Sequence, residues 1–490
     1  METMNRRTFL RTTAIIAAVA ASGMTAQAAE ARRPNILVLL TDDVGWGDPT
    51  CYNPKSKIPT PNIDKLAADG MRFTHAHTPA ALCSPTRYSM LSGNYSWRGR
   101  AAAGVWGFNV PSAFKHGQKS VGRMLQAAGY RTAMFGKAGI GGFYARSKKE
   151  KPSKTLAPVA WGFDYSWIVP KGHQAPPLAF FENGVAATDI RNNRAPEWSH
   201  SKVGASLLEK AAGFLDDHLA NHKDKPFYMH FCSDGAHGPY DPAARLAGQP
   251  LAGATKMTAH TDMVYETDIL LGALVKALEK RGLRDNTLVI YVSDNGGLPF
   301  ERDHGHDAVA GLRGLKSTIF EGGQRVPFVA SWPGRIPKGT VRNQLIGAHD
   351  TVATALELAG VTVPKGQARD SISLVPVLLG KRDDKNPVRK TLLVQSSPGR
   401  GAFVDKGYRA GKPGPKTPEK TKGSKRKGGR QMAFALFAGN WKLVLQNGKP
   451  EALYDLTVDL AEENNLIADS THASRVKQMT MQYQKIRTGK

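Results

Sequence analysis

Asn35-Ile36-Leu37-Val38-Leu39-Leu40-Thr41 is a run of mostly aliphatic residues, and Asp42-Asp43 follows it directly. A continuous apolar run of this length predicts a strand buried on both faces, as in a parallel sheet. Similar strand-like runs alternate with helical patterns up to about residue 375, which predicts an α/β fold. We expect a large mixed, mostly parallel sheet sandwiched by helices.

Chemically functional side chains follow the expected strands where each strand ends. In open α/β sheets these ends meet at one edge, where ligands bind. Three aspartates and one asparagine follow these strands. As metal ligands they offer only oxygen atoms, and such a site suits calcium or magnesium better than zinc. Nearby basic side chains favour a tetrahedral anionic ester, either a sulfate or a phosphate. For Asp42-Asp43, the alternative is a solvated acidic turn. The acids and amide are Asp42, Asp43, Asp294 and Asn295, and the basic residues are Arg87, Lys137, His237 and Lys316.

The stretch Leu82-Cys83-Ser84-Pro85-Thr86-Arg87-Tyr88-Ser89-Met90-Leu91-Ser92-Gly93 reads as the start of a helix. Proline is tolerated in a first helical turn, and a helix N-terminus favours anions. Cys83 is therefore either a reactive residue at a helix N-terminus, where the partial positive charge favours anions, or a buried cysteine where a strand turns into a helix. The chain has only 3 Cys, so no disulfide framework is expected. Cys51 and Cys232 are either a pair or two free thiols.

Net charge and the N-terminus limit the class of partner. A formal net charge of +26 attracts polyanions such as nucleic acid, anionic lipid or acidic polysaccharide. Arg6-Arg7 precedes the apolar stretch Ala14 to Ala21 and the small-residue site Ala26-Gln27-Ala28, which predicts a twin-arginine export signal. The apolar stretch is too short for a stable membrane anchor. We therefore expect a periplasmic or secreted bacterial protein, for which nucleic acid is not a partner.

The rest of the chain suggests a second, smaller unit. Residues 141–200 show little periodicity, and we expect loops that shape a substrate mouth. Beyond residue 375, short strand-like runs and a last helical pattern predict a small antiparallel sheet with one helix. Residues 406–430 hold ten Lys/Arg and one acid, which indicates a solvated loop, an arm that attracts a polyanion, or both. The expected division is a signal peptide (1–28), a large α/β domain (29–375) and a C-terminal α+β subdomain (376–490).

In this order along the chain, the motifs resemble those of the formylglycine-dependent, arylsulfatase-like sulfatases of the alkaline phosphatase superfamily. The resemblance runs from about Pro34 to Asn465. It implies an alkaline phosphatase-like fold and the hydrolysis of sulfate esters. The motifs that carry it are Asp42-Asp43, Cys83-Ser84-Pro85-Thr86-Arg87, Gly136-Lys137, Ala236-His237, Ser293-Asp294-Asn295-Gly296, Leu312-Arg313-Gly314-Leu315-Lys316, Glu321-Gly322-Gly323, Leu453-Tyr454-Asp455-Leu456 and Glu463-Asn464-Asn465-Leu466.

The resemblance also implies a mechanism. A separate maturation enzyme would oxidise Cys83 to formylglycine, whose hydrate attacks sulfur with one hydroxyl and expels sulfate with the other. Calcium, or magnesium in its place, would be held by the two adjacent aspartates together with Asp294 and Asn295. Lys137 and Lys316 would bind sulfate oxygens, Arg87 would polarise the hydrate, and His237 would protonate or bind near the leaving oxygen.

One position departs from the family. Members carry a histidine two residues after the lysine that matches Lys137, and here that residue is Gly139. In the family this histidine contacts the hydrate, so the residue that serves as its base is an open question here. His304 and His306 are candidates to replace it or to bind substrate, with a polar loop as the alternative, and His173 is a weaker candidate.

Three functions compete. The leading hypothesis is a sulfatase that acts on a sulfated carbohydrate, with a small aryl sulfate as the other substrate class. The runner-up is a phosphodiesterase or phosphonate hydrolase of the same superfamily, because the same nucleophile segment serves phosphorus esters. The third is a non-catalytic binder of sulfated glycans, which Gly139 makes plausible.

Overall fold

A computed structural model gives the structure of the chain and describes residues 33–489 except 109, 144–156, 193 and 398–431. The expected signal peptide and the basic loop 406–430 lie outside the described residues. Asn35–Lys490 forms one compact unit. The domain boundary near residue 375 therefore stays a prediction.

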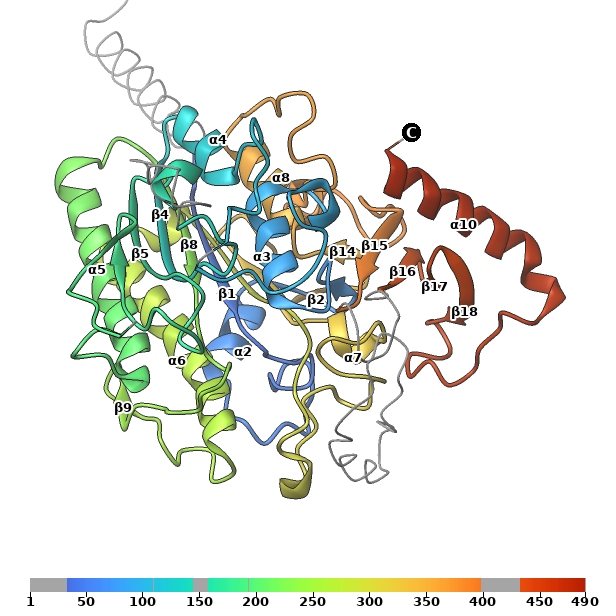
Figure 1. Cartoon of the computed structure of the whole chain (residues 1–490), viewed down its shortest axis with the longest axis horizontal. Helices are drawn as coiled ribbons and strands as arrows, with labels where there is room; N and C mark the ends of the chain where they lie inside the picture. The colour runs from blue at the N-terminus through green and yellow to red at the C-terminus, as the bar shows by residue number, and fades with distance from the viewer. Residues whose placement is uncertain (1–32, 109, 144–156, 193, 398–431, 490) are drawn as a thin grey trace, which may run out of the picture. The chain divides into compact units, whose positions relative to one another are not determined.

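A ten-stranded mixed sheet forms the centre of this unit, in the order β13-β2-β12-β11-β1-β8-β4-β5-β6-β7 (Figure 1). Its central strands β11, β1, β8, β4 and β5 are parallel, as predicted, while β12 runs antiparallel to β11. All residues of β1 are buried, in keeping with a strand covered on both faces. The strands are β1 (Asn35–Thr41), β2 (Met71–Phe73), β4 (Arg131–Lys137), β5 (Tyr165–Val169), β6 (Phe181–Glu182), β7 (Val185–Ala186), β8 (Phe227–Cys232), β11 (Thr287–Ser293), β12 (Phe328–Ser331) and β13 (Thr340–Arg342).

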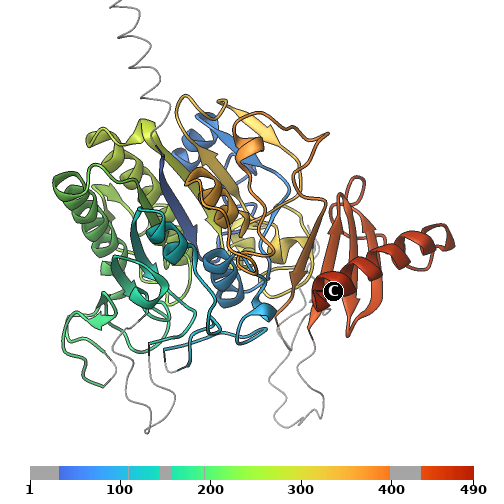
Figure 2. The same cartoon turned by 90° about the horizontal axis from the view of Figure 1, so that it is seen from above.

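Helices cover both sides of this sheet (Figure 2). The helices α2, α5 and α6 pack together on one side, and α3, α4 and α8 on the other. The predicted sandwich of helices around a mostly parallel sheet is thus confirmed. The helices are α2 (Pro61–Ala68), α3 (Cys83–Ser92), α4 (Val121–Ala127), α5 (Val203–Asn221), α6 (Ala259–Lys280), α7 (Glu321–Gln324), α8 (Asp350–Leu358), α9 (Val375–Leu378) and α10 (Ala473–Thr488).

The predicted small antiparallel sheet lies near the C-terminus, in the order β15-β16-β17-β18, with α10 packed against it. Its strands bury a second hydrophobic core, separate from the core of the large sheet. Two further two-stranded sheets lie in connecting segments. The remaining strands are β3 (Ala76–His77), β9 (Arg245–Leu246), β10 (Gln249–Pro250), β14 (Ile346–Gly347), β15 (Thr391–Gln395), β16 (Ala433–Ala438), β17 (Trp441–Gln446) and β18 (Lys449–Asp455).

The segment 141–200 differs from the expectation of loops alone. Its strand β5 pairs in parallel with β4 and extends the central sheet, and β6 and β7 continue the sheet beyond it. Five residues between glycine- and proline-rich turns give too short a pattern for sequence periodicity to detect. Within the described ranges, no helix combines the length and the apolar character that a membrane span requires.

Candidate active site

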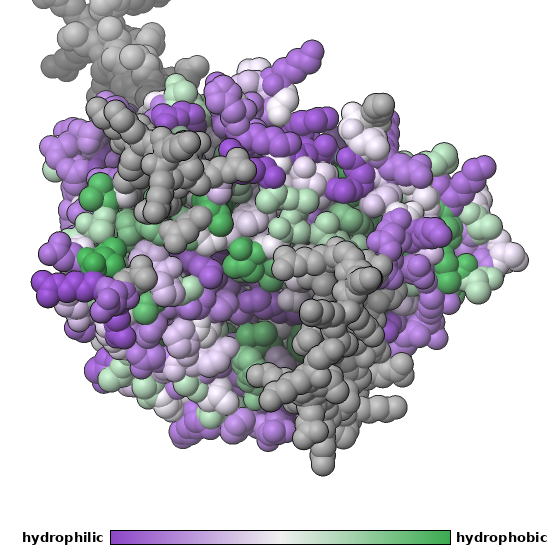
Figure 3. Space-filling model, viewed as in Figure 1, coloured by the Kyte–Doolittle hydropathy of each residue, from purple (hydrophilic) through white to green (hydrophobic). Residues whose placement is uncertain are grey.

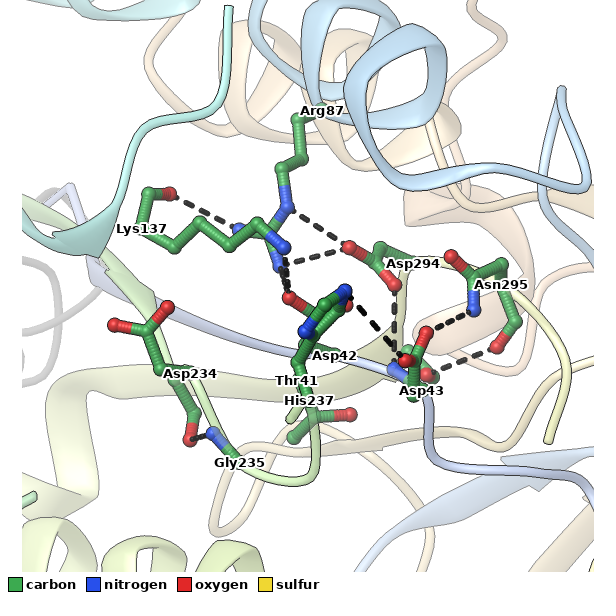
Figure 4. Close-up of polar contacts among 12 residues, drawn as sticks. Thr41, Asp42, Asp43, Arg87, Lys137, Asp234, Gly235, His237, Asp294 and Asn295 are labelled. Carbon is green, nitrogen blue, oxygen red and sulfur yellow. Dashed lines mark hydrogen bonds and ion pairs between the residues drawn. The ribbon is translucent and has the colours of Figure 1, made fainter. Parts of the chain in front are cut away.

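The predicted strand-end residues converge at one edge of the large sheet (Figure 4). In the register of the sheet, Thr41 of β1 lies beside Ser293 of β11, and Leu40 lies beside Cys232 of β8. The residues that follow these positions therefore leave the sheet side by side, although they are far apart in the sequence. Asp42, Asp43, His237 and Asp294 therefore lie close together, as expected for residues that follow the carboxyl ends of parallel strands.

Arg87 joins the carboxylates on one side of the site. Its Nε donates to Asp294 Oδ2 at 2.8 Å, and its Nη2 lies 3.4 Å from Asp42 Oδ2. Its Nη1 donates to the backbone carbonyl of Lys137 at 3.0 Å, and the Lys137 ammonium forms an ion pair with Asp42. All four side chains are buried. Two basic side chains and two carboxyl groups are therefore held together out of contact with solvent.

Asp43 organises the other side. Its Oδ1 lies 2.5 Å from Lys316 Nζ and accepts a hydrogen bond from Asn295 Nδ2 at 2.7 Å. Its Oδ2 lies 4.0 Å from His237 Nε2. His237 Nδ1 lies 2.8 Å from the carbonyl oxygen of Gly238, which can only accept, so Nδ1 carries a proton. The φ of Asp43 is 61°, a strained conformation of the kind that gathers at functional sites.

Cys83 is the first residue of α3, as the sequence predicted, and it is buried. Ser84 Oγ accepts from Trp106 N at 3.1 Å and Thr86 Oγ1 donates to Ala80 O at 2.9 Å, so neighbouring loops hold this helix start. Burial raises the pKa of the Cys83 thiol, although Lys137 opposes the shift. An unmodified cysteine here is therefore protonated at neutral pH, which makes it a weak nucleophile.

The residues at this edge fit a hard divalent cation. Asp42 Oδ1 and Asn295 Oδ1 are buried, and neither has a hydrogen-bond partner in the part of the chain that the structure describes. A cation would satisfy such oxygen atoms, which are otherwise costly to bury. Potential ligand atoms of Asp42, Asp43 and His237 lie within 4.8 Å of one another. Carboxylate and amide oxygens are the ligands that calcium prefers.

The basic side chains keep their charges despite burial. Burial alone would lower the pKa of Lys137 and of Lys316. The Asp42 carboxylate raises the pKa of Lys137 above its ordinary range, and the carboxylates of Asp43 and Asp42 do the same for Lys316. For His237 burial prevails over the nearby Asp42 carboxylate and lowers the pKa of the imidazole. At neutral pH the site thus offers two ammonium groups and a neutral imidazole, a suitable lining for a tetrahedral anion.

Residues 34–361 match the family model described as Sulfatase. That range is more than half of the chain, and it contains every residue of the site described above. The chain belongs to the sulfatase family. The predicted resemblance to sulfatases of the alkaline phosphatase superfamily is confirmed, and so is the prediction of a sulfuric ester hydrolase.

Similar proteins agree with this assignment. Human arylsulfatase A is 31% identical over 464 residues, which cover 90% of this chain and 84% of that protein. An N-acetylgalactosamine-6-O-sulfatase from Bacteroides thetaiotaomicron is 26% identical over 511 residues, covering 93% of this chain and 94% of that one. A solved structure described under the metabolism of multiple glycosaminoglycans by Bacteroides thetaiotaomicron shares the fold, with a TM-score of 0.76, 24% identity and coverage of 94% of this chain and 100% of that chain.

His304 and His306, the candidates to replace the histidine that is absent at Gly139, contact other parts of this sulfatase. His306 is buried, and its Nε2 lies 2.8 Å from Asp48 Oδ1. His304 is exposed, and its carbonyl accepts from Lys57 Nζ at 2.6 Å. No contact joins either side chain to the strand-end carboxylates among the described residues. Their roles in catalysis or substrate binding stay predictions.

Two residues beside Lys137 had no role, or a minor one, in the sequence prediction. Asp234 is buried two residues after β8, and its Oδ1 accepts from the backbone N–H of His173 at 3.3 Å. His173 is also buried, and its Nε2 lies 2.7 Å from the carbonyl oxygen of His237. A Cβ on Gly172 would lie 2.8 Å from both Asp234 Oδ1 and Lys137 Cδ. The strand-end rule could have singled out Asp234, because it follows β8 as Asp42 follows β1.

The structure answers whether Cys51 and Cys232 of this sulfatase form a disulfide. Cys51 and Cys232 are both free, so they do not form a disulfide. Burial raises the pKa of both thiols to about 12. Both therefore stay protonated at neutral pH, and unlike Cys83 neither begins a helix at the site.

Proposed function

We propose that this sulfatase hydrolyses sulfate esters on a sulfated carbohydrate. A relative that covers nearly the whole chain is named as an N-acetylgalactosamine-6-O-sulfatase. The formal net charge of +26 would attract an anionic glycan. The observation that carries the proposal is the burial of Cys83 among Lys137, Lys316, Asp42 and Asp294, the charged groups that act on its thiol.

We assign the nucleophile to a formylglycine made from Cys83 by a separate maturation enzyme. The thiol is buried and protonated, so it would attack a sulfate ester poorly as cysteine. Once water adds to its aldehyde, a formylglycine at this position would supply one hydroxyl as the nucleophile and a second hydroxyl, whose deprotonation re-forms the aldehyde and releases sulfate. Arg87 lies one turn further along the same helix, where it places a permanent positive charge beside the attacking group.

The remaining basic residues bind the anionic parts of the ester. Lys137 forms an ion pair with Asp42 and Lys316 forms one with Asp43, and we assign both lysines to the non-bridging sulfate oxygens. Their charges would stabilise the negative charge that grows on these oxygens in the transition state. His237 Nε2 lies 4.0 Å from Asp43 Oδ2, and we assign this imidazole to the leaving-group oxygen, which it would bind or protonate.

Asp42, Asp43, Asp294 and Asn295 are the residues that would hold the cation, which we propose to be calcium, with magnesium as the alternative. The unpartnered buried oxygens of Asp42 and Asn295 support this assignment. A cation in this position supplies positive charge next to the nucleophile and the ester.

The mass of the peptide that contains Cys83, measured after co-expression with a formylglycine-generating enzyme, tests the nucleophile. We expect an aldehyde in place of the thiol, and we expect Cys83→Ala to abolish turnover. Cys51→Ala, at a free thiol outside the site, is the matched control and should keep its activity. Full activity with an unmodified thiol would contradict the assignment.

Phosphorus esters are the alternative substrates, because the same anion site would accept a phosphate or phosphonate. The rates of hydrolysis of 4-nitrophenyl sulfate, 4-nitrophenyl phosphate and a phenyl phosphonate under the same conditions distinguish a sulfatase from a hydrolase of phosphorus esters. A higher kcat/KM for the sulfate supports the proposal. A screen of sulfated mono- and oligosaccharides would then identify the sugar and the sulfate position.

We also propose export to the periplasm or the medium through the twin-arginine machinery. Arg6-Arg7 and the apolar stretch after them support this proposal. Cell fractionation of the wild type and of an Arg6→Lys/Arg7→Lys variant tests it. We expect the variant to accumulate inside the cell, and equal export of both proteins would contradict the proposal.

A further inference from the structure

Two aromatic side chains on the described surface are exposed in an unusual way. Among the large hydrophobic residues that the structure describes as exposed, only Tyr240 and Phe300 are aromatic, with exposed fractions of 37% and 50%. The two rings contact each other edge to face, with centroids 5.8 Å apart. Single exposed hydrophobic residues are common on soluble proteins, whereas a pair of contacting aromatic rings marks a binding surface more often. The face drawn in Figure 3 is mostly hydrophilic, with small hydrophobic groups beside a central hollow.

Both rings come from loops that also carry residues of the active site. Tyr240 lies three residues after His237, and Phe300 lies five residues after Asn295. The Tyr240 ring packs over Gly238, and the carbonyl oxygen of Gly238 lies 2.8 Å from Nδ1 of His237. The pair therefore lies at the rim of the carboxylate cluster, on the side of His237.

The buried contact between His260 and Glu301 supports the two rings. His260, near the start of α6, packs against Tyr240 with centroids 5.1 Å apart and against Phe300 with centroids 5.4 Å apart. Its Nδ1 lies 2.6 Å from Glu301 Oε1, which also accepts from Thr258 Oγ1 at 3.1 Å. Because these contacts hold both rings in place, little side-chain entropy is lost when a ligand binds to them.

The Tyr240 ring packs against Gly238, where a side chain would crowd it. A Cβ on residue 238 would lie 3.3 Å from Tyr240 Cζ, so the ring folds directly over the glycine. No hydrogen bond of the Tyr240 hydroxyl is found among the described residues. The ring thus keeps a polar group that is available to a ligand, next to an apolar surface.

We propose that Tyr240 and Phe300 form an aromatic ledge that binds the sugar ring bearing the sulfate ester. This inference rests on the proposed function and names the part of the site that selects the leaving group. A pyranose ring has an apolar C–H face and a polar edge, which match the π-face of Phe300 and the ring and hydroxyl of Tyr240. The sulfate itself would contact the lysines instead of the ledge.

Phe300→Ala and Tyr240→Ala test the ledge with N-acetylgalactosamine 6-sulfate as the saccharide substrate. We expect KM to rise roughly five- to tenfold in each variant while kcat changes little. The inhibition constant of free inorganic sulfate should stay unchanged, because sulfate has no ring to stack. Tyr240→Phe keeps the ring and should show at most part of the effect. Val341→Ala removes an exposed hydrophobic side chain on the distant edge strand β13 and is the matched control.

The outcomes separate the ledge from the proposed function. If the wild type hydrolyses the sulfated sugar and both alanine variants keep the wild-type KM for it, the ledge is overturned and the function stands. If the wild type hydrolyses only 4-nitrophenyl sulfate, sulfate ester hydrolysis stands, and calorimetric titration of the sulfated sugar into the wild type and Phe300→Ala decides the ledge. If the wild type hydrolyses neither ester, the proposed function fails, and calorimetric titration of the sulfated sugar into the wild type and Phe300→Ala tests the ledge directly. Weaker binding by the variant supports the ledge, and equal or absent binding overturns it.

Discussion

Lys442 Nζ lies 2.8 Å from Glu321 Oε1, and neither side chain is accessible to solvent. The same ammonium lies 2.7 Å from Glu462 Oε1, so one buried lysine of β17 joins two carboxylates. Glu321 begins α7, five residues after Lys316. The small sheet is therefore tied by a buried ion pair to the segment that carries one of the anion-binding lysines.

Lys442→Met should strongly destabilise the protein. The substitution would leave two carboxylates buried without their shared cation, which costs about 3–5 kcal/mol when one partner of a buried pair is lost. Denaturant unfolding should show this loss, and Lys449→Met, at an exposed lysine on the neighbouring β18, should unfold like the wild type. Wild-type stability in Lys442→Met would mean that the two carboxylates share a proton instead.

The contrast between Asp42 and Lys442 shows what could be predicted from the sequence. Asp42 follows an apolar run, and the rule for parallel strand ends places it at the site without knowledge of the strand order. The partners of Lys442 are set by how the small sheet packs on α7, and no local pattern records that packing. The Tyr240–Phe300 contact was missed for the same reason, because it joins two loops across 60 residues.

Removal of the proposed cation should lower both activity and stability. The unpartnered oxygens of Asp42 and Asn295 would lose their ligand, and the carboxylates would repel one another. We expect a chelator to lower the Tm and calcium to restore it, with about 2.7 kcal/mol of stabilisation at a calcium concentration near one hundred times Kd. Asp43→Asn should reduce the calcium-dependent shift, whereas Asp216→Asn, at an exposed aspartate, should not. A Tm that changes with neither chelator nor calcium would contradict the cation site.

Glu266 should make stability fall as the pH rises. Burial and the nearby Asp234 raise the pKa of this α6 carboxyl from 4.5 to about 7. A folded-state pKa above the unfolded value means that the folded protein holds the proton longer, so stability is greatest below the unfolded pKa and is lost as the pH rises through the folded one. Between about pH 5 and about pH 8 the wild type should lose roughly 2–3 kcal/mol relative to Glu266→Gln.

Denaturant unfolding of both proteins at the two pH values measures that difference. Glu209→Gln, at an exposed position on α5, is the control and should follow the wild type at both. Parallel pH profiles of the wild type and Glu266→Gln would show that the buried carboxyl does not titrate in this range.

Gly139 occupies the position where the family carries a histidine, and its backbone is suited to glycine. Its φ is 67°, and a Cβ there would lie 3.2 Å from Arg87 Cδ. Gly139→Ala and Gly139→His should therefore lower the free energy of unfolding by more than the cost of about 1 kcal/mol for a side chain in the left-handed region. Both should also lower kcat/KM, because Arg87 would be displaced from Asp294. Gly439→Ala is the matched control, since its φ is 60° and no atom lies within 4 Å of the added carbon. Increased activity in Gly139→His would instead show that the missing histidine limits this enzyme.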